Sequence, residues 1–168
     1  MRVVMIAQAW WLLAASADRG VVAQRSPVQL DVADYRPMAK REPAAEDIRT
    51  ALLDVLEEQK IPVSSSAKTR LRVELVEAEK HDDEGTKTCA RVRSWIVDME
   101  KEYLPKREIV AERCVPTSWP KVPAEGDVNW IGVADAISRA SHKSDALTYA
   151  YAEALSEVIA NLRRRLDR

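Results

Sequence analysis

Two cysteines in facing extended segments restrict the fold of this chain more than any other feature. The segments KTCARVRSWIVDM and KREIVAERCV carry Cys89 near the start of one and Cys114 near the end of the other. A turn about Lys101-Glu102 sets the two cysteines opposite each other and brings Arg91 against Glu112. Apolar side chains then share the other face: Ala90, Val92, Ile96, Ile109 and Ala111. The sequence therefore predicts an antiparallel hairpin with one apolar face and one charged face.

The pair formed by Cys89 and Cys114 is suited to a disulfide. Opposed residues on antiparallel strands bring their Cα atoms close enough for this bond, most readily at a non-hydrogen-bonded pair. The alternative is a redox-active or metal-binding pair, but the chain has no Cys-x-x-Cys and no histidine nearby in sequence. We predict a structural disulfide, which stabilises the fold by about 3 to 4 kcal/mol in the chain-entropy model.

The N-terminus predicts export from the cytoplasm. A short basic start, Met1-Arg2, precedes an apolar run from Val3 to Leu13 that only Gln8 interrupts. The small residues Ala15-Ser16-Ala17 follow, at the positions that a signal peptidase reads. We therefore predict a signal peptide over residues 1–17.

Alternatives stay open at this leader. Cleavage is expected before Asp18, and a second option before Gln24 would use Val21 and Ala23. An uncleaved membrane anchor would need about 20 apolar residues, whereas this run is shorter and stops at Asp18-Arg19. Residues 18–168 are expected to form a single α+β domain, periplasmic or secreted, with no membrane span after cleavage. Because the formal net charge is only −1, no global field attracts nucleic acid.

Hydrophobic periodicity predicts the remaining elements. Period-2 alternation indicates strands over Ser26–Arg36 and Thr69–Ala78, in addition to the two strands of the hairpin. Helical spacing indicates a first helix over Ala44–Gln59 and a final helix that Ser144 caps. Trp130–Ala140 is a weaker candidate for a short helix. The apolar stripes of the two main helices are Ile48, Ala51, Leu52, Val55 and Leu56 in the first, and Leu147, Tyr151, Ala154, Leu155, Val158, Leu162 and Leu166 in the last.

These elements predict a two-layer α+β sandwich. Each strand has one apolar face and each main helix one apolar stripe, so the economical solution places two helices on one face of a mainly antiparallel four-stranded sheet. The pattern leaves open which strand the first one pairs with, and whether that pair is parallel.

Few residues are candidates for chemistry. The run His81-Asp82-Asp83-Glu84 offers an imidazole and three carboxylates, but its spacing matches no loop of defined metal ligands, and a solvated turn is favoured. His142 could act as a general base for a nearby serine, yet no nucleophile motif or orienting carboxylate marks it. We assign no catalytic residue, no metal site and no cofactor, and expect a protein that is not an enzyme.

Two groups of residues are candidates for contact with a partner. Trp119 lies within a proline-bearing stretch, Thr117–Asn129, and Trp130 follows it. The two would form a binding patch if exposed or cover the end of the sandwich if buried. Arg163, Arg164 and Arg165, followed by Arg168, could bind phosphate or acidic lipid, although a solvated helix end is the favoured interpretation.

The element order and apolar spacing resemble those of small envelope lipoproteins of Gram-negative bacteria. The resemblance is carried by VQLDVADYRP, DIRTALLDVLEEQKI, TRLRVELVEAE, the hairpin and the closing ALTYAYAEALSEVIANLRRRL. Such families include the auxiliary lipoproteins of ABC-type transport systems, whose exported α+β domain assists a transport or assembly machine. This sequence lacks the lipid-bearing cysteine at the end of its signal peptide, so the resemblance implies a soluble member.

The leading hypothesis is an exported, non-catalytic accessory or binding domain of the bacterial cell envelope that contacts a protein partner or an envelope component. A secreted hydrolase with an unidentified carboxylate or histidine site is the runner-up. A small secreted inhibitor that inserts its tryptophan loop into a target's cleft is a third interpretation.

Overall fold

The structure of the protein, a computed structural model, describes residues 25–81, 85, 87–101, 108–118 and 129–168. The predicted signal peptide, the turn residue Glu102, the acidic run 82–84 and Trp119 lie outside the described residues. The elements are β1 (Val28–Asp34), η1 (Met38–Lys40), α1 (Ala45–Glu58), β2 (Thr69–His81), β3 (Lys87–Asp98), η2 (Met99–Lys101), β4 (Glu108–Pro116), α2 (Asn129–Ser141) and α3 (Ala146–Leu166).

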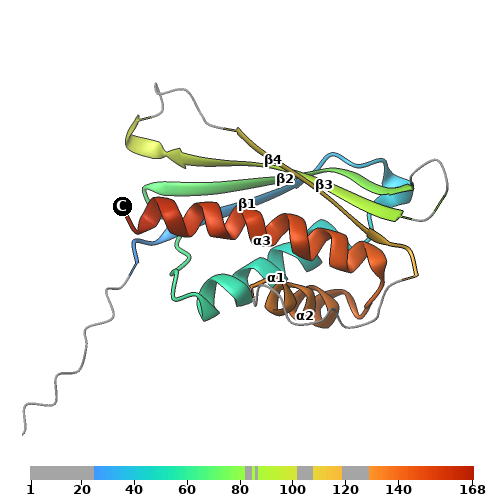
Figure 1. The fold of residues 1–168 in the computed structure, drawn as a ribbon. Coiled ribbons are helices and arrows are strands. Elements are labelled where there is room, and N and C mark those ends of the chain that lie inside the picture. Colours follow the sequence, from blue (N-terminus) through green and yellow to red (C-terminus); the bar gives the residue numbers. More distant parts are fainter. Residues whose placement is uncertain (1–24, 82–84, 86, 102–107, 119–128) are drawn as a thin grey trace, which may run out of the picture.

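The sheet is mixed, with strand order β1-β2-β3-β4 (Figure 1). The strands β2, β3 and β4 follow one another as antiparallel neighbours, whereas β1 and β2 pair in parallel. The helix α1 connects β1 to β2 and returns the chain to the end of the sheet from which β1 started, which makes the pair parallel. The prediction of a mainly antiparallel sheet is therefore wrong, because the pattern could not show the direction of β1.

Three helices lie on one side of this sheet, and not two as predicted. The helices α1 and α3 contact the strands, whereas α2 packs against α1 and α3 on the side away from the sheet (Figure 1). The helix α2, which was not among the two predicted to cover the sheet, buries Val133, Ala134, Ala136 and Ile137. The α+β class is supported, but the prediction counted only helices whose stripe could face the sheet.

The hairpin forms in the predicted register. Cys89 pairs with Cys114 and Arg91 with Glu112, so the residues that alternate with them point to the helices. Ala90, Val92 and Ala111 are fully buried there. The register follows from the period of two, because a slip by one residue would turn the apolar set to solvent.

The helices bury most of the stripe residues that their spacing predicts, although Leu147 and Leu166 of α3 are only partly buried. All five predicted apolar residues of α1 are buried. In α3 the buried surface is wider than one stripe and includes Ala150, Ala152 and Ile159, because α2 covers the flank that the sheet leaves open. None of the helices in the described parts of the chain is both long and apolar enough to span a bilayer.

The cap of α3 differs from the prediction. Asp145, not Ser144, is the N-cap, and its Oδ1 accepts a hydrogen bond of 2.9 Å from the backbone N–H of Thr148. A carboxylate at this position faces the positive end of the helix. The Ser144 hydroxyl lies instead 3.1 Å from the Tyr149 hydroxyl.

Candidate functional site

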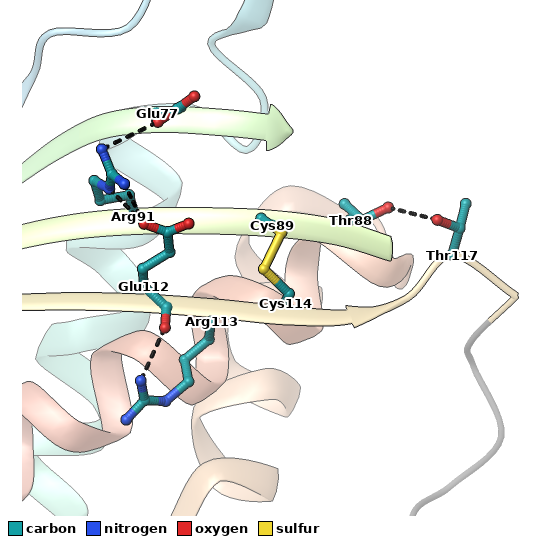
Figure 2. The surroundings of a disulfide bond; sticks show 8 residues. All are labelled: Glu77, Thr88, Cys89, Arg91, Glu112, Arg113, Cys114 and Thr117. Carbon is teal, nitrogen blue, oxygen red and sulfur yellow. Dashed lines mark hydrogen bonds and ion pairs between the residues drawn. A yellow bond between two sulfur atoms is a disulfide. The ribbon is translucent and has the colours of Figure 1, made fainter. Parts of the chain in front are cut away.

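The two cysteines form a disulfide on the sheet face that points away from the helices (Figure 2). Their Cα atoms are 4.0 Å apart, the close spacing of a non-hydrogen-bonded antiparallel pair. Arg91 lies on the same face and binds Glu112 across the pair and Glu77 on β2. The bond therefore joins β3 to the edge strand β4 and leaves no free thiol among the described residues.

The outer face of the sheet neutralises its own charges. Arg72 and Arg93 lie on either side of Glu74, with N–O distances of 3.0 and 3.2 Å. Asp31 is 3.8 Å from Arg72, and Glu108 is 3.9 Å from Arg93. Because positive and negative side chains alternate across the strands, this face presents no single sign of charge to a partner.

A groove lies between the C-terminal part of α3 and the turn end of the β3–β4 hairpin. It has a volume of about 690 Å³ and is lined by Ile96, Glu108, Ile109, Glu157, Asn161, Arg164, Arg165 and Arg168. The two isoleucines lie on the helix-facing side of the sheet, and Ile96 is buried. The groove thus combines an apolar floor with a basic wall.

The acidic side chains of this groove are already paired. Glu157 binds Arg113 of β4, and the Glu108 carboxylate lies 3.9 Å from Arg93 Nε. Arg164 donates a hydrogen bond of 2.7 Å to the amide oxygen of Asn161. Within the described residues, no carboxylate lies within 4 Å of the guanidinium groups of Arg164, Arg165 and Arg168, in contrast to the arginines of the outer face.

The structure separates the predicted contact residues. Arg164 and Arg165 line the groove, whereas Arg163 lies on another side of α3, near Val55 of α1 and the C-cap residue Gln59. Trp130 belongs to α2, is half-buried and packs against the core. Its ring meets that of Tyr149 edge to face, with centroids 6.2 Å apart. Trp130 and the arginines thus belong to different surfaces.

The two histidines lie at the ends of different elements. His142 is exposed in the connection between α2 and α3 and has a positive φ of 56°. His81 ends β2, where its backbone pairs with Thr88. Among the described residues, no group of three His, Cys, Asp or Glu side chains converges so as to hold a metal ion.

A buried arginine is the polar feature that sequence reasoning missed. Arg36 is only 1% exposed, and it donates hydrogen bonds to Asp34, the Tyr151 hydroxyl and the carbonyls of Glu42 and Pro43. Burial acts to raise the pKa of Asp34, but the hydrogen bonds from Arg36 hold it below its usual value. The guanidinium has no N–H left for a ligand, so we regard this cluster as structural.

Tyr151 completes the cluster from the N-terminal part of α3. Its hydroxyl donates a hydrogen bond of 3.2 Å to the Glu77 carbonyl of β2. Burial raises the pKa of Tyr151 to about 12, against the opposing influence of Arg36. The sequence offered little indication of this cluster. Tyr151 lies in an apolar stripe, and Arg36 comes just after a strand, where charged residues are common.

Comparison with known proteins assigns no family. No protein-family model matches the chain. No curated protein matches it either. Partial structural likenesses exist, each at low sequence identity. A DUF330 protein from Xanthomonas campestris is 13% identical over 84% of this chain and 85% of its own, with a TM-score of 0.47.

Two further solved structures show a similar degree of likeness. The PelC dodecamer from Paraburkholderia phytofirmans is 10% identical over 77% of this chain and 89% of that chain, with a TM-score of 0.44. A minor lipoprotein from Acinetobacter baumannii is 14% identical over 83% and 93%, with a TM-score of 0.38. The chain therefore has partial likenesses to these proteins and no family assignment.

Proposed function

We propose that this protein is an exported, non-catalytic binding domain of the bacterial cell envelope that contacts a protein partner. The disulfide between Cys89 and Cys114 carries the proposal together with the apolar leader that precedes the domain. Disulfides persist in oxidising compartments and are rare in a reducing cytosol. A small α+β domain that contains a disulfide and follows an apolar N-terminal segment is typical of a protein in the periplasm or outside the cell.

The distribution of polar groups supports binding over catalysis. The buried polar cluster around Arg36 is satisfied internally, and the ionic groups of the outer sheet face compensate one another. The groove beside α3 instead combines an apolar floor with three arginines that have no carboxylate within 4 Å among the described residues. Such a surface suits recognition of a charged partner.

Export and function are tested in the native host. The full-length protein, expressed at its normal level, is fractionated, and its N-terminus is determined by mass spectrometry. We expect a mature protein that starts at Asp18 or Gln24, lies outside the cytoplasm and contains no free thiol when denatured without reductant. A cytoplasmic product that keeps residues 1–17 and two free thiols would contradict the proposal.

The same purified protein distinguishes a binding domain from a hydrolase. We expect no turnover of ester, glycoside or peptide substrates above the level of a matched His142→Ala variant. Turnover that this substitution abolishes would favour the secreted hydrolase, because His142 is an exposed histidine.

A further inference from the structure

The groove between α3 and β4 offers positive charge and free backbone groups to the same ligand. We propose that it binds an extended acidic segment of a protein partner, which adds as a strand to the free edge of β4. This inference rests on the proposed function and specifies the chemistry of the partner.

The charge argument comes from the stripe on α3 that faces β4. Glu157, Asn161, Arg164 and Arg168 recur at helical spacing and line the groove, with Arg165 beside them. Glu157 is occupied by Arg113, whereas the arginines of the stripe have no carboxylate partner in the described part of the chain. Arginine binds carboxylates through paired N–H donors. Acidic side chains on a partner would therefore complement the wall that α3 presents.

The backbone argument comes from the edge position of β4. Among the described strands, β4 pairs with β3 alone. The short Cα distance marks Cys89–Cys114 as a non-hydrogen-bonded pair, and in an antiparallel ladder these pairs alternate with bonded ones. The backbone groups of Glu108, Val110 and Glu112 therefore point away from β3, towards the open edge.

The two halves of this edge differ. Near the disulfide, the Arg113 guanidinium donates a hydrogen bond of 2.8 Å to the Glu112 carbonyl and so uses one of the outward backbone acceptors. The half at Glu108–Val110 carries no hydrogen bond to another described element on its outer side, and Val110 is 54% exposed. This half adjoins the groove. A strand added here would direct alternate side chains towards the α3 arginines.

A protein segment fits these observations better than an anionic membrane. Membrane-binding basic clusters contain about four to eight Lys or Arg on an accessible face, whereas the groove holds three arginines beside two glutamates. The free edge of β4 can pair with the backbone of a peptide, whereas a lipid headgroup has no such backbone. The overall charge of −1 also provides no long-range attraction to a bilayer.

The test uses the mature, oxidised protein and a short fluorescent peptide in which glutamate and valine alternate. We expect saturable binding that weakens as salt is raised. The variant Arg164→Gln/Arg165→Gln should bind about tenfold more weakly, the loss expected for two partly exposed ion pairs. The matched variant Arg49→Gln/Arg139→Gln changes the net charge equally at exposed sites outside the groove, and should bind within about twofold of the parent.

Further arms decide how the segment binds. In an added strand, the N–H groups of only one set of residues, the glutamates or the valines, would face β4. We therefore expect that methylation of the peptide nitrogens of that set abolishes binding and that methylation of the other set does not. Binding that tolerates both modifications would overturn strand addition. Equal binding by the groove variant and the parent would overturn the site. Vesicles of phosphatidylglycerol that bind the parent but not the groove variant, when the peptide does not bind, would assign the arginines to lipid and overturn the proposal.

Failure of this inference is distinguishable from failure of the proposed function. If the protein is exported and disulfide-bonded but does not bind the peptide, only the proposal that the groove binds an acidic segment is refuted. A protein retained in the cytoplasm with free thiols would refute the proposed function, whatever the peptide does.

Discussion

The Arg36 guanidinium lies 5.4 Å from the centroid of the Tyr151 ring and donates a hydrogen bond of 3.0 Å to its hydroxyl. This contact joins a residue just beyond β1 to the N-terminal part of α3, across 115 positions of sequence. Asp34 balances the charge through hydrogen bonds of 2.8 and 2.9 Å. A buried arginine that is paired and fully hydrogen-bonded fixes how two elements meet.

Replacement of Arg36 by methionine should destabilise the protein strongly. The substitution leaves the Asp34 carboxylate, the Tyr151 hydroxyl and two backbone carbonyls without their donor. Loss of one partner from a buried ion pair costs about 3 to 5 kcal/mol. Urea denaturation monitored by circular dichroism measures the free energy of unfolding. Arg49→Met, on the exposed face of α1, is the control and should change it by less than about 0.5 kcal/mol; equal effects of the two substitutions would show that the cluster contributes nothing specific.

Acid should weaken the same cluster. The pKa of Asp34 is lowered in the folded protein, since the hydrogen bonds from Arg36 outweigh burial. Its contribution to stability is therefore present above the unfolded-state pKa of about 3.9 and is lost as pH falls through the lower folded-state pKa. Asp34→Asn should flatten the fall in the free energy of unfolding below about pH 4. An acid profile with the same slope in parent and variant would contradict this role.

Removal of the disulfide should lower stability without changing the fold. The bond closes a loop between residues separated by 25 positions, so Cys89→Ser with Cys114→Ser should cost about 3 to 4 kcal/mol. The hairpin register should persist, because apolar alternation and the Arg91–Glu112 pair also specify it. Thermal denaturation of the variant and of the parent, with and without reductant, checks this. Reductant should destabilise the parent and leave the variant unchanged.

The N-cap of α3 provides a prediction with a neighbouring control. Asp145→Ala removes the acceptor of the Thr148 N–H and should cost about 1 kcal/mol. Ser144→Ala, one residue earlier, should cost less than about 0.5 kcal/mol because Ser144 does not cap the helix. The midpoint of chemical denaturation compares the two variants. A larger loss for Ser144→Ala would restore the cap expected from the sequence alone.

Local patterns were sufficient where a feature depends on neighbours along one element. The stripe of α1 and the alternating faces of the hairpin follow from the periods of the helix and the strand. The opposition of Cys89 to Cys114 follows as well, because the apolar set and the charge pair permit one register. The export signal is likewise read from composition along a short segment, and it remains a prediction.

Tertiary structure alone decided how these elements combine. The apolar face of β1 is compatible with more than one neighbour and either direction, and α2 packs on helices instead of the sheet because α1 and α3 already cover the strands. Arg36 meets Tyr151, and Arg164 flanks β4, only after distant segments pack together. Periodicity shows which side of an element is apolar and will be buried, but it carries no information about which other element packs against that side.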